Sequence, residues 1–295
     1  MNTFAGIVPL RRGSAMLALV GLFVVGSFPS GASGTDSSGP VTIDRGAVPD
    51  PAVDPFAVRG GRTQIESLPV DPAFPGTASY VFGTSVHGRP LVAYHRKGSS
   101  QPTRRVVVFG VIHGDEQVGH LVIDAMMSAS LPTDLDLWLI PTVNPDGEAV
   151  ISRQNANHVD LNRNFPADWE TGTLSSSGRY YSGPSPASEP ETRATMALVA
   201  LIQPTISVWY HQPFDRVDCD QSRVGAVCTT FANAVGSSVG LSVRSGTESD
   251  WIMSAGHGLS FVYEFSATSP PALIVAEHVA ALLALARPLT LPPAG

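Results

Sequence analysis

The sequence predicts an α/β fold, with one domain built on a central mixed, mainly parallel twisted sheet flanked by helices. From Tyr80 onward, short apolar segments rich in β-branched residues alternate with segments of helical spacing, as they do in α/β domains. Of the 295 residues, 43% are hydrophobic and only 15% are charged, which suits one large domain with a sizeable core. The sequence contains no visible internal repeat, so a repeat architecture is not expected.

Five strands and four helices are expected within this domain. The apolar segments predict strands at residues 89–95, 105–111, 135–140, 206–210 and 261–265. A helix with one buried stripe is indicated by apolar residues at helical spacing, namely Val118, Leu121, Val122, Ala125 and Met126. Further helices are expected at residues 189–201, 226–234 and 272–286.

The N-terminal residues 1–32 have the pattern of a signal peptide. The basic pair Arg11-Arg12 precedes an apolar segment, Ala15 to Phe28, and the small residues Ser30-Gly31-Ala32 follow. A membrane-spanning helix is the alternative, but it needs about 20 apolar residues. We therefore expect a secreted or cell-envelope protein with no membrane contact after signal removal, exported by a route that the sequence leaves open.

Three further regions follow the signal peptide. Residues 33–78 are rich in Pro and Gly and are expected to form a linker or extended segment. The folded domain is expected at residues 79–289, and residues 290–295 form a tail. Net charge is −7, and basic residues form no cluster beyond two Arg pairs, so nucleic acid is not expected as a partner. The oligomeric state is not indicated.

The chain has two cysteines, Cys219 and Cys228. In an oxidising exported setting, a pair so close in sequence predicts a disulfide. A cysteine-based zinc site is the competing interpretation, but it would need two more Cys or His ligands nearby. None lies between the two cysteines.

Polar residues follow the predicted strands where each one ends. His113 and Glu116 follow one strand and His211 ends another, so these side chains can meet at the carboxyl edge of the sheet. His113 and Glu116 can supply two of the three ligands of a catalytic zinc. His211 is the best candidate for the third, because an apolar strand delivers it, and His120 is the alternative, four residues after Glu116.

At these residues the sequence resembles the zinc carboxypeptidase family, whose pattern is His-x-x-Glu, a distant His and a catalytic Glu on a late strand. Further segments match in the family's order: Asn144-Pro145-Asp146-Gly147, Asp160-Leu161-Asn162-Arg163-Asn164-Phe165 and Ser188-Glu189-Pro190-Glu191-Thr192. The resemblance covers residues 80–289 and is nearest in character to bacterial murein peptide amidases. It implies a zinc metallopeptidase fold for the whole predicted domain.

The resemblance implies one zinc ion per chain, held by His113, Glu116 and His211. It makes Glu264 the catalytic base, which takes a proton from a zinc-bound water and passes it to the leaving nitrogen.

Four more residues receive roles from the resemblance. Arg153 matches the family arginine that stabilises the developing oxyanion. Asn162 and Arg163 match the pair that grips a substrate carboxylate. Asp160 is expected to accept a hydrogen bond from the non-coordinating nitrogen of His113.

One feature of the family pattern is missing. Family members that trim C-terminal residues have a Tyr on a loop before the late strand, and no Tyr lies between His211 and Val262. The matching loop, residues 245–251, places the specificity position near Glu248 and Ser249. An acidic pocket there would suit a side chain that bears an ammonium group.

These features lead to a substrate hypothesis, which is an exported enzyme that cleaves an amide bond in diaminopimelate-containing cell-wall peptides. One alternative is a carboxypeptidase that removes C-terminal basic residues. Another is an amidohydrolase of the succinylglutamate desuccinylase and aspartoacylase group, against which the export signal argues. A wall-binding module without catalysis is the non-enzymatic alternative.

Overall fold

A nine-stranded mixed sheet forms the centre of the described part of the chain. The computed structural model describes residues 65–70, 72, 74–172, 178–241, 245–267 and 271–286, all of which belong to one compact unit. The predicted signal peptide, residues 33–64 of the predicted linker and the predicted tail lie outside the described residues.

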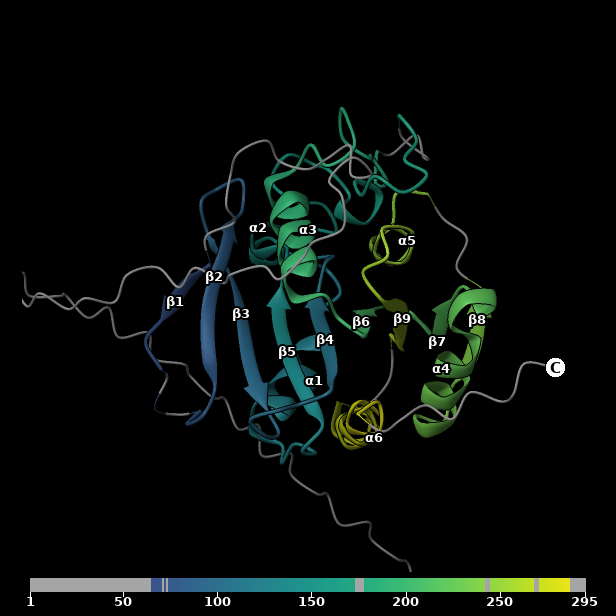
Figure 1. Cartoon of the computed structure of the whole chain (residues 1–295). Helices are drawn as coiled ribbons and strands as arrows, with labels where there is room; N and C mark the ends of the chain where they lie inside the picture. The colour runs from purple at the N-terminus through teal and green to yellow at the C-terminus, as the bar shows by residue number, and fades with distance from the viewer. Residues whose placement is uncertain are drawn as a thin grey trace, which may run out of the picture. The chain divides into compact units, whose positions relative to one another are not determined.

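The strands run in the order β1-β2-β3-β5-β4-β6-β9-β7-β8 (Figure 1). The central neighbours β5, β4, β6 and β9 are parallel. The pairs β1–β2, β2–β3 and β3–β5 are antiparallel, and so is the pair β9–β7, while β7 and β8 are parallel. The mixed sheet is therefore confirmed, with its parallel pairing in the centre and at one edge. The strand bounds are β1 Glu66–Leu68, β2 Ala78–Thr84, β3 Pro90–Lys97, β4 Arg104–Val111, β5 Leu135–Thr142, β6 Ile206–His211, β7 Phe214–Cys219, β8 Ser238–Leu241 and β9 Leu259–Ser266.

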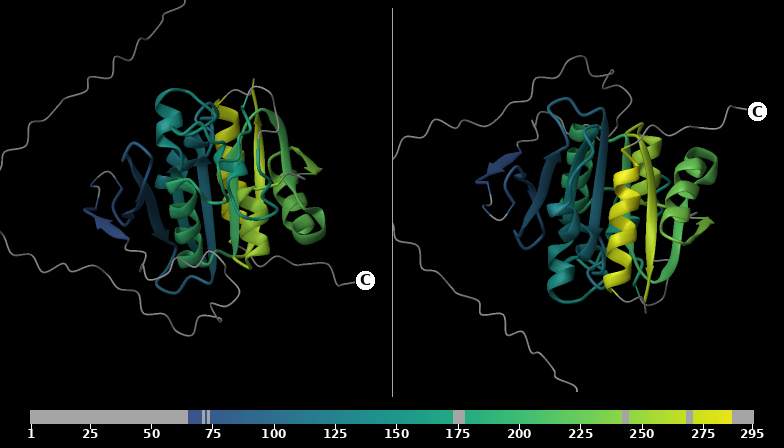
Figure 2. Two further views of the ribbon diagram at one scale, coloured as in Figure 1. Left: turned by 90° about the horizontal axis from the view of Figure 1, so that it is seen from above. Right: turned by 90° about the horizontal axis from the view of Figure 1, so that it is seen from below.

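Helices cover both faces of this sheet (Figures 1 and 2). Helices α1, α4 and α6 pack with Val106 and Val108 of β4 in one core cluster. Helices α3 and α5 pack with Val107 and Phe109 of the same strand in the other. Successive side chains of a strand point to opposite faces, which is why one apolar strand feeds two cores. The helix bounds are α1 Gly119–Ser128, α2 Pro145–Ala149, α3 Pro190–Ile202, α4 Gln221–Ala234, α5 Glu248–Ser254 and α6 Pro271–Ala284.

All five predicted strands and all four predicted helices are present, with bounds that differ by a few residues. Strands β1, β2, β7 and β8 and the short helices α2 and α5 were not predicted. Strand β1 and the first residue of β2 lie within residues 33–78, the predicted linker or extended segment. No helix in the described residues is long and apolar enough to cross a bilayer.

The predicted disulfide is confirmed. Cys219 ends β7 and is bonded to Cys228 in α4, with their Cα atoms 6.7 Å apart. Both residues are buried in the core beneath α4. The bond therefore fastens α4 to the edge of the sheet.

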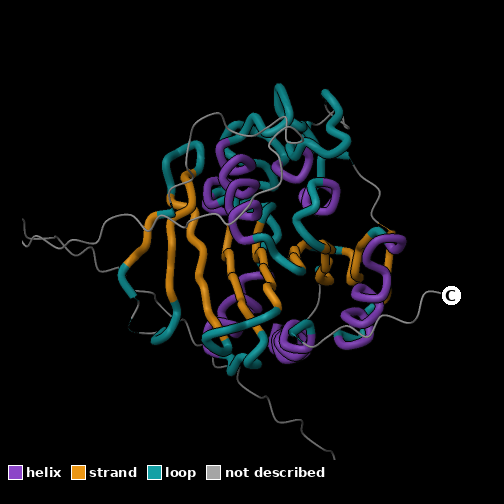
Figure 3. Tube along the Cα trace, in the orientation of Figure 1, coloured by secondary structure: helices purple, strands orange, loops and turns teal. Residues whose placement is uncertain are grey.

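Long connections gather at one end of the sheet, beyond the carboxyl ends of β4, β5 and β6 (Figure 3). The connection from α2 to α3 contains the 3₁₀ helix η2, Leu161–Arg163. Ligands bind at this edge of α/β sheets. The residues singled out in the sequence lie there.

His278 on α6 should make stability depend on pH. Its side chain is buried, and its Nδ1 lies 3.1 Å from the hydroxyl of Tyr210. Burial lowers its pKa from 6.5 to about 3. Between pH 6.5 and pH 3, His278 is therefore protonated in the unfolded chain but neutral in the folded chain. The free energy of unfolding falls as the pH drops through this range, by up to about 1.4 kcal/mol per pH unit.

Urea unfolding of a His278→Phe variant at pH 7 and pH 4.5 tests this. We expect the variant to lose less stability on acidification than the parent protein. His158→Asn is the control, because His158 is exposed and has a positive φ of 59°, a backbone conformation that Asn tolerates. An unchanged loss in His278→Phe would contradict the assignment.

Candidate active site

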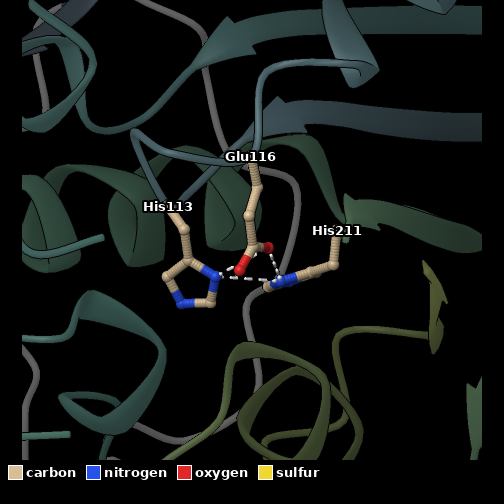
Figure 4. A group of neighbouring side chains, drawn as sticks. All are labelled: His113, Glu116 and His211. Atoms are coloured by element: carbon tan, nitrogen blue, oxygen red, sulfur yellow. Dashed lines mark hydrogen bonds and ion pairs between the residues drawn. The ribbon is translucent and has the colours of Figure 1, made fainter. Parts of the chain in front are cut away.

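Three side chains from two strand ends converge on one point (Figure 4). His113 and Glu116 lie on the turn after β4, and His211 is the last residue of β6. The Nδ1 atom of His113 is 3.0 Å from Glu116 Oε2 and 3.1 Å from His211 Nδ1. His211 Nδ1 is also 3.1 Å from Glu116 Oε2. All three residues are buried, so the sequence prediction that they meet is confirmed.

This donor set fits a zinc ion. Two imidazole nitrogens and one carboxylate are a ligand set of catalytic zinc sites, which leave a fourth position open. Ligand atoms about 2.1 Å from a tetrahedral zinc lie about 3.4 Å apart, close to the observed separations. The three side chains also line a cavity, so the fourth position can face substrate.

Asp160 orients His113 as predicted. Its Oδ1 is 3.1 Å from His113 Nε2, and its carboxylate is fully buried. Burial would raise the pKa of Asp160, but the charges of His113 and Arg153 keep it well below its ordinary value. A carboxylate that holds the Nε2 proton leaves the Nδ1 lone pair directed at the metal position.

Arg153 lies against this cluster. Its Nε donates to Asp160 Oδ2 at 2.9 Å, and its NH1 group donates to Glu116 Oε1 at 3.1 Å. The same NH1 group is 3.2 Å from His113 Nδ1. The guanidinium therefore lies beside His113 and Glu116 and lines the cavity, where the oxyanion role requires it.

Glu264 is brought to the site by strand register. Parallel pairing of β6 with β9 sets Glu264 directly opposite His211. Its carboxylate is buried, and Oε2 has no hydrogen-bond partner in the described residues. Burial first, and then the charges of Glu116 and Asp218, raise its pKa. A carboxylate with a raised pKa at the cavity wall is suited to take up a proton.

Asn162 and Arg163 lie on η2 and line the same cavity. Both side chains are buried. The Asn162 Oδ1 atom accepts from the backbone N–H of Glu248 at 3.2 Å. The guanidinium of Arg163 lies 5.6 Å from the ring centroid of Tyr180. Their position agrees with the predicted grip on a substrate carboxylate.

Glu248 is among the residues around the cavity, but its side chain is poorly placed for the predicted contact with substrate. Its side chain is completely buried, and Oε1 lies 3.6 Å from His211 Nε2. The carboxylate therefore points at the back of a predicted metal ligand. Asp250, two residues further along α5, is partly exposed and lines the cavity.

His120 does not join the cluster. Its Nε2 pairs with the carboxylate of Glu148 on α2, and that hydrogen bond is the largest cause of its raised pKa. Among the described residues, the group that can hold a metal contains His211 instead. The preference for His211 over His120 is therefore supported by the geometry.

Residues 72–213 match the sequence profile of the zinc carboxypeptidase family. The same family order of ligands is present in the converging cluster. The chain therefore carries a zinc carboxypeptidase domain. Glu264 lies beyond the matched residues, and its assignment depends on its position opposite His211.

Murein peptide amidases are among the relatives of this zinc carboxypeptidase domain. Murein peptide amidase A of Escherichia coli K12 is 34% identical over 149 residues, which are 47% of this chain and 60% of that protein. The corresponding protein of Vibrio campbellii is 32% identical over 148 residues, 46% of this chain and 58% of that protein. The matches thus span about three fifths of these relatives.

Solved structures share the fold. The murein-tripeptide amidase MpaA from Escherichia coli O157 has a TM-score of 0.58 at 26% identity, over 75% of this chain and 97% of that one. Thrombin activatable fibrinolysis inhibitor has a TM-score of 0.64 at 19% identity, over 72% of this chain and 69% of that one, and shows the fold alone.

The Asn144-Pro145-Asp146-Gly147 segment explains why the ligand turn is rigid. The side chain of Asn144 accepts from Gly147 N at 3.0 Å and donates to the carbonyl of Ile112 at 3.0 Å. Gly147 packs against Gly114, where a Cβ would lie 2.1 Å from the Gly147 carbonyl carbon. The segment therefore holds the backbone on both sides of His113.

The cavity also contains residues that sequence reasoning missed, among them Tyr180, Phe214 and Asp218. Tyr180 lies in the irregular connection before α3, which carries no periodic signal. Phe214 and Asp218 lie on β7, where charged residues interrupt the apolar pattern. Only a prediction of β7 as a strand beside β9 could have placed them.

A Gly114→Ala substitution should disturb this zinc carboxypeptidase site. The added methyl group meets backbone atoms of α2, so we expect a loss of about 1–3 kcal/mol in stability and weaker zinc binding. Gly225→Ala in α4 is the control, since its Cβ would meet nothing closer than 3.7 Å, and it should be neutral or gain up to about 1 kcal/mol. Urea unfolding and zinc competition measure both effects, and wild-type values for Gly114→Ala would contradict the packing argument.

Tyr180 should support substrate binding through its ring. The guanidinium carbons of Arg153 and Arg163 lie 5.1 Å and 5.6 Å from its centroid, and such contacts contribute about 0.5–2 kcal/mol. We expect Tyr180→Leu to raise KM for a peptide with a free carboxylate by roughly 2- to 30-fold, with a smaller change in kcat. Tyr180→Phe keeps the ring and should stay near wild type. Equal losses in the two variants would assign the effect to the hydroxyl instead.

Proposed function

We propose that this zinc carboxypeptidase relative is an exported amidase that cleaves diaminopimelate-containing cell-wall peptides beside a carboxylate-bearing residue. One observation carries the proposal, which is that arginines and carboxylates line the same cavity from different parts of the chain, next to the predicted zinc ligands. A zwitterionic group needs both kinds of partner. The distal end of diaminopimelate bears a carboxylate and an ammonium on one carbon.

The arginines come from one segment. Arg153, Arg163 and Arg179 all line the cavity and all lie between α2 and α3. A planar guanidinium binds a carboxylate through two parallel hydrogen bonds. Arg163 is the predicted anchor for the substrate carboxylate, and Arg153 lies closer to the reacting bond.

The carboxylates come from the opposite set of elements. Asp218 lies on β7, Asp220 caps α4 and Asp250 lies on α5. Burial first, and then the charges of neighbouring carboxylates including Glu248 and Asp220, raise the pKa of Asp250. An ammonium beside Asp250 would relieve that repulsion. Asp250 therefore takes the ammonium-binding role that the sequence had suggested for Glu248.

The reacting groups are arranged for hydrolysis of an amide. A zinc ion held by His113, Glu116 and His211 would polarise the scissile carbonyl and acidify water. Glu264 takes the proton from the attacking water and delivers it to the leaving nitrogen. The guanidinium of Arg153 stabilises the negative charge on the carbonyl oxygen. Water is consumed, the C–N bond breaks, and one carboxylate and one amine are released.

Relatives and sequence support the remaining parts of the proposal. The murein peptide amidases match over about three fifths of their length. Export is supported by the N-terminal signal pattern and by the disulfide, which forms in oxidising compartments.

A carboxypeptidase for C-terminal basic residues is the second candidate. The acidic residues at the cavity favour it, and the human carboxypeptidase N catalytic chain is 30% identical over 162 residues, 41% of this chain and 34% of that protein. The absence of a Tyr between His211 and Val262 counts against it. Small acyl amino acids, the substrates expected of the aspartoacylase-like alternative, have no ammonium for Asp250 to bind.

Metal analysis coupled to digestion of defined substrates tests the function. We expect about one zinc per chain and release of diaminopimelate from a muropeptide faster than Lys or Arg from simple peptides. Glu264→Gln should keep the zinc and lose roughly 10²- to 10⁴-fold in turnover, whereas His113→Ala should lose the zinc. His120→Ala is the control and should keep both the zinc and most of the activity.

Three results would reject the proposal. Faster release of Lys or Arg would favour the carboxypeptidase, and faster cleavage of acyl amino acids would favour the aspartoacylase-like alternative. Wild-type turnover in Glu264→Gln would show that Glu264 is not the catalytic base.

A further inference from the structure

We propose that Glu248 is a positioning residue for the metal site. Its carboxylate holds the ring of His211 in place, as the carboxylate of Asp160 holds the ring of His113. The inference rests on the proposed zinc chemistry, because it concerns a partner of one predicted zinc ligand. Nothing in the family pattern quoted above gives His211 such a partner. The zinc site would then have two carboxylate-supported histidines.

The burial of Glu248 requires a partner inside the protein. Its side chain is 0% exposed. Neither Oε1 nor Oε2 has a hydrogen-bond partner in the described residues. A buried carboxylate without a compensating partner is costly. In the described part of the chain, Glu248 Oε1 lies 3.6 Å from His211 Nε2, which is close enough for an ion pair.

The orientation of His211 makes its Nε2 atom a donor. Its Nδ1 atom faces the other two ligands, at 3.1 Å from each of His113 Nδ1 and Glu116 Oε2. When Nδ1 binds a metal, the neutral ring carries its proton on Nε2. That N–H needs an acceptor because the ring is buried.

Asn162 cannot be that acceptor in the observed arrangement. Its Nδ2 atom is 3.4 Å from His211 Nε2, and an amide NH₂ group is a donor. Its Oδ1 atom faces away and accepts from the backbone N–H of Glu248 at 3.2 Å. The carboxylate of Glu248, whose Oε1 lies 3.6 Å from His211 Nε2, is therefore the group that we assign as acceptor for the His211 ring.

The backbone around Glu248 is held firmly enough to aim its side chain. Gly246 donates to Ala167 and accepts from Phe165, so the segment is fastened on both sides to the chain after η2. Gly246 has a φ of +68°, and a Cβ there would lie 2.4 Å from the carbonyl oxygen of Arg163. Thr247 caps α5 by accepting from Asp250 N. Glu248 is thus the first residue of a capped helix.

Zinc affinity separates a positioning role from a substrate-binding role. Loss of a carboxylate partner of a zinc-bound histidine weakens metal binding by about 10- to 100-fold. We expect that loss in Glu248→Gln by competition with a chelator, and a smaller loss in Glu248→Asp, which keeps the charge. Asp160→Asn is the positive control. Asp250→Asn is the matched control on the same helix and should keep its zinc affinity within about twofold.

A spectroscopic measurement identifies which histidine is affected. In the cobalt-substituted protein, each ligating histidine has one exchangeable ring N–H whose proton resonance is strongly shifted by the metal. Glu248→Gln should move or broaden one of the two resonances, and Asp160→Asn the other. Glu248→Asp provides the same readout if Glu248→Gln fails to fold.

Each outcome decides between the roles. Weaker zinc binding with a change in a single resonance supports the proposal. Unchanged zinc affinity with a raised KM for the diaminopimelate substrate overturns it and returns Glu248 to substrate binding. If the wild-type chain itself binds no zinc, the proposed function fails, whereas wild-type zinc binding that Glu248→Gln leaves unaltered rejects this inference alone.

Discussion

The parallel pairing of β4, β6 and β9 is the constraint on which the site depends. In its register Phe109 of β4 lies opposite Trp209 of β6, and His211 of β6 lies opposite Glu264 of β9. Because parallel strands end at one edge, the ligand turn after β4, the second histidine and the proposed base are delivered together. A shift of β9 by one residue would turn Glu264 to the other face. The core packing that fixes register therefore also fixes the chemistry.

The second requirement is that buried charges compensate one another. Asp160 receives His113 on one oxygen and Arg153 on the other. Glu116 contacts Arg153, and the charge and hydrogen bond of His113 overcome the effect of burial to lower its pKa. Such groups are costly to bury singly and tolerable as a network. Glu264 lacks a partner for Oε2 in the described residues and has a raised pKa, as a group that exchanges protons needs.

The sequence predicted the central strands and the ligand cluster because both depend on local, repeated signals. From Val106 onward, strand β4 has no polar side chain, since helices cover both of its faces, and His113 and Glu116 come shortly after it. Strand β7 gave no such signal. It lies near the edge of the sheet, and three of its six residues are charged, Asp215, Arg216 and Asp218.

The role of Glu248 lay beyond the reach of the sequence for a different reason. The family resemblance of the loop at residues 245–251 indicated that residues near 248 approach the site, and they do. Successive side chains of a helix point in different directions, however, and where each one points depends on how the helix packs against the rest of the domain. Contacts of Gly246 with the chain after η2 set that docking here. The resemblance thus predicted that these residues lie near the site, while the direction of each carboxylate depends on tertiary structure.

This separation of directions gives neighbouring carboxylates different tasks. Both residues border the cavity, but Glu248 is fully buried with its Oε1 3.6 Å from His211 Nε2, whereas Asp250 is partly exposed. One short helix can therefore support the metal site from within and present an acidic group to a ligand. Tyr180 offers an aromatic ring in place of the Tyr that is missing before the late strand. It lines the cavity from the segment before α3 and lies against Arg153 and Arg163. In the proposed function, substrate contacts would come from the arginine-bearing segment and from α5, around the three predicted zinc ligands, which lie on neither of them.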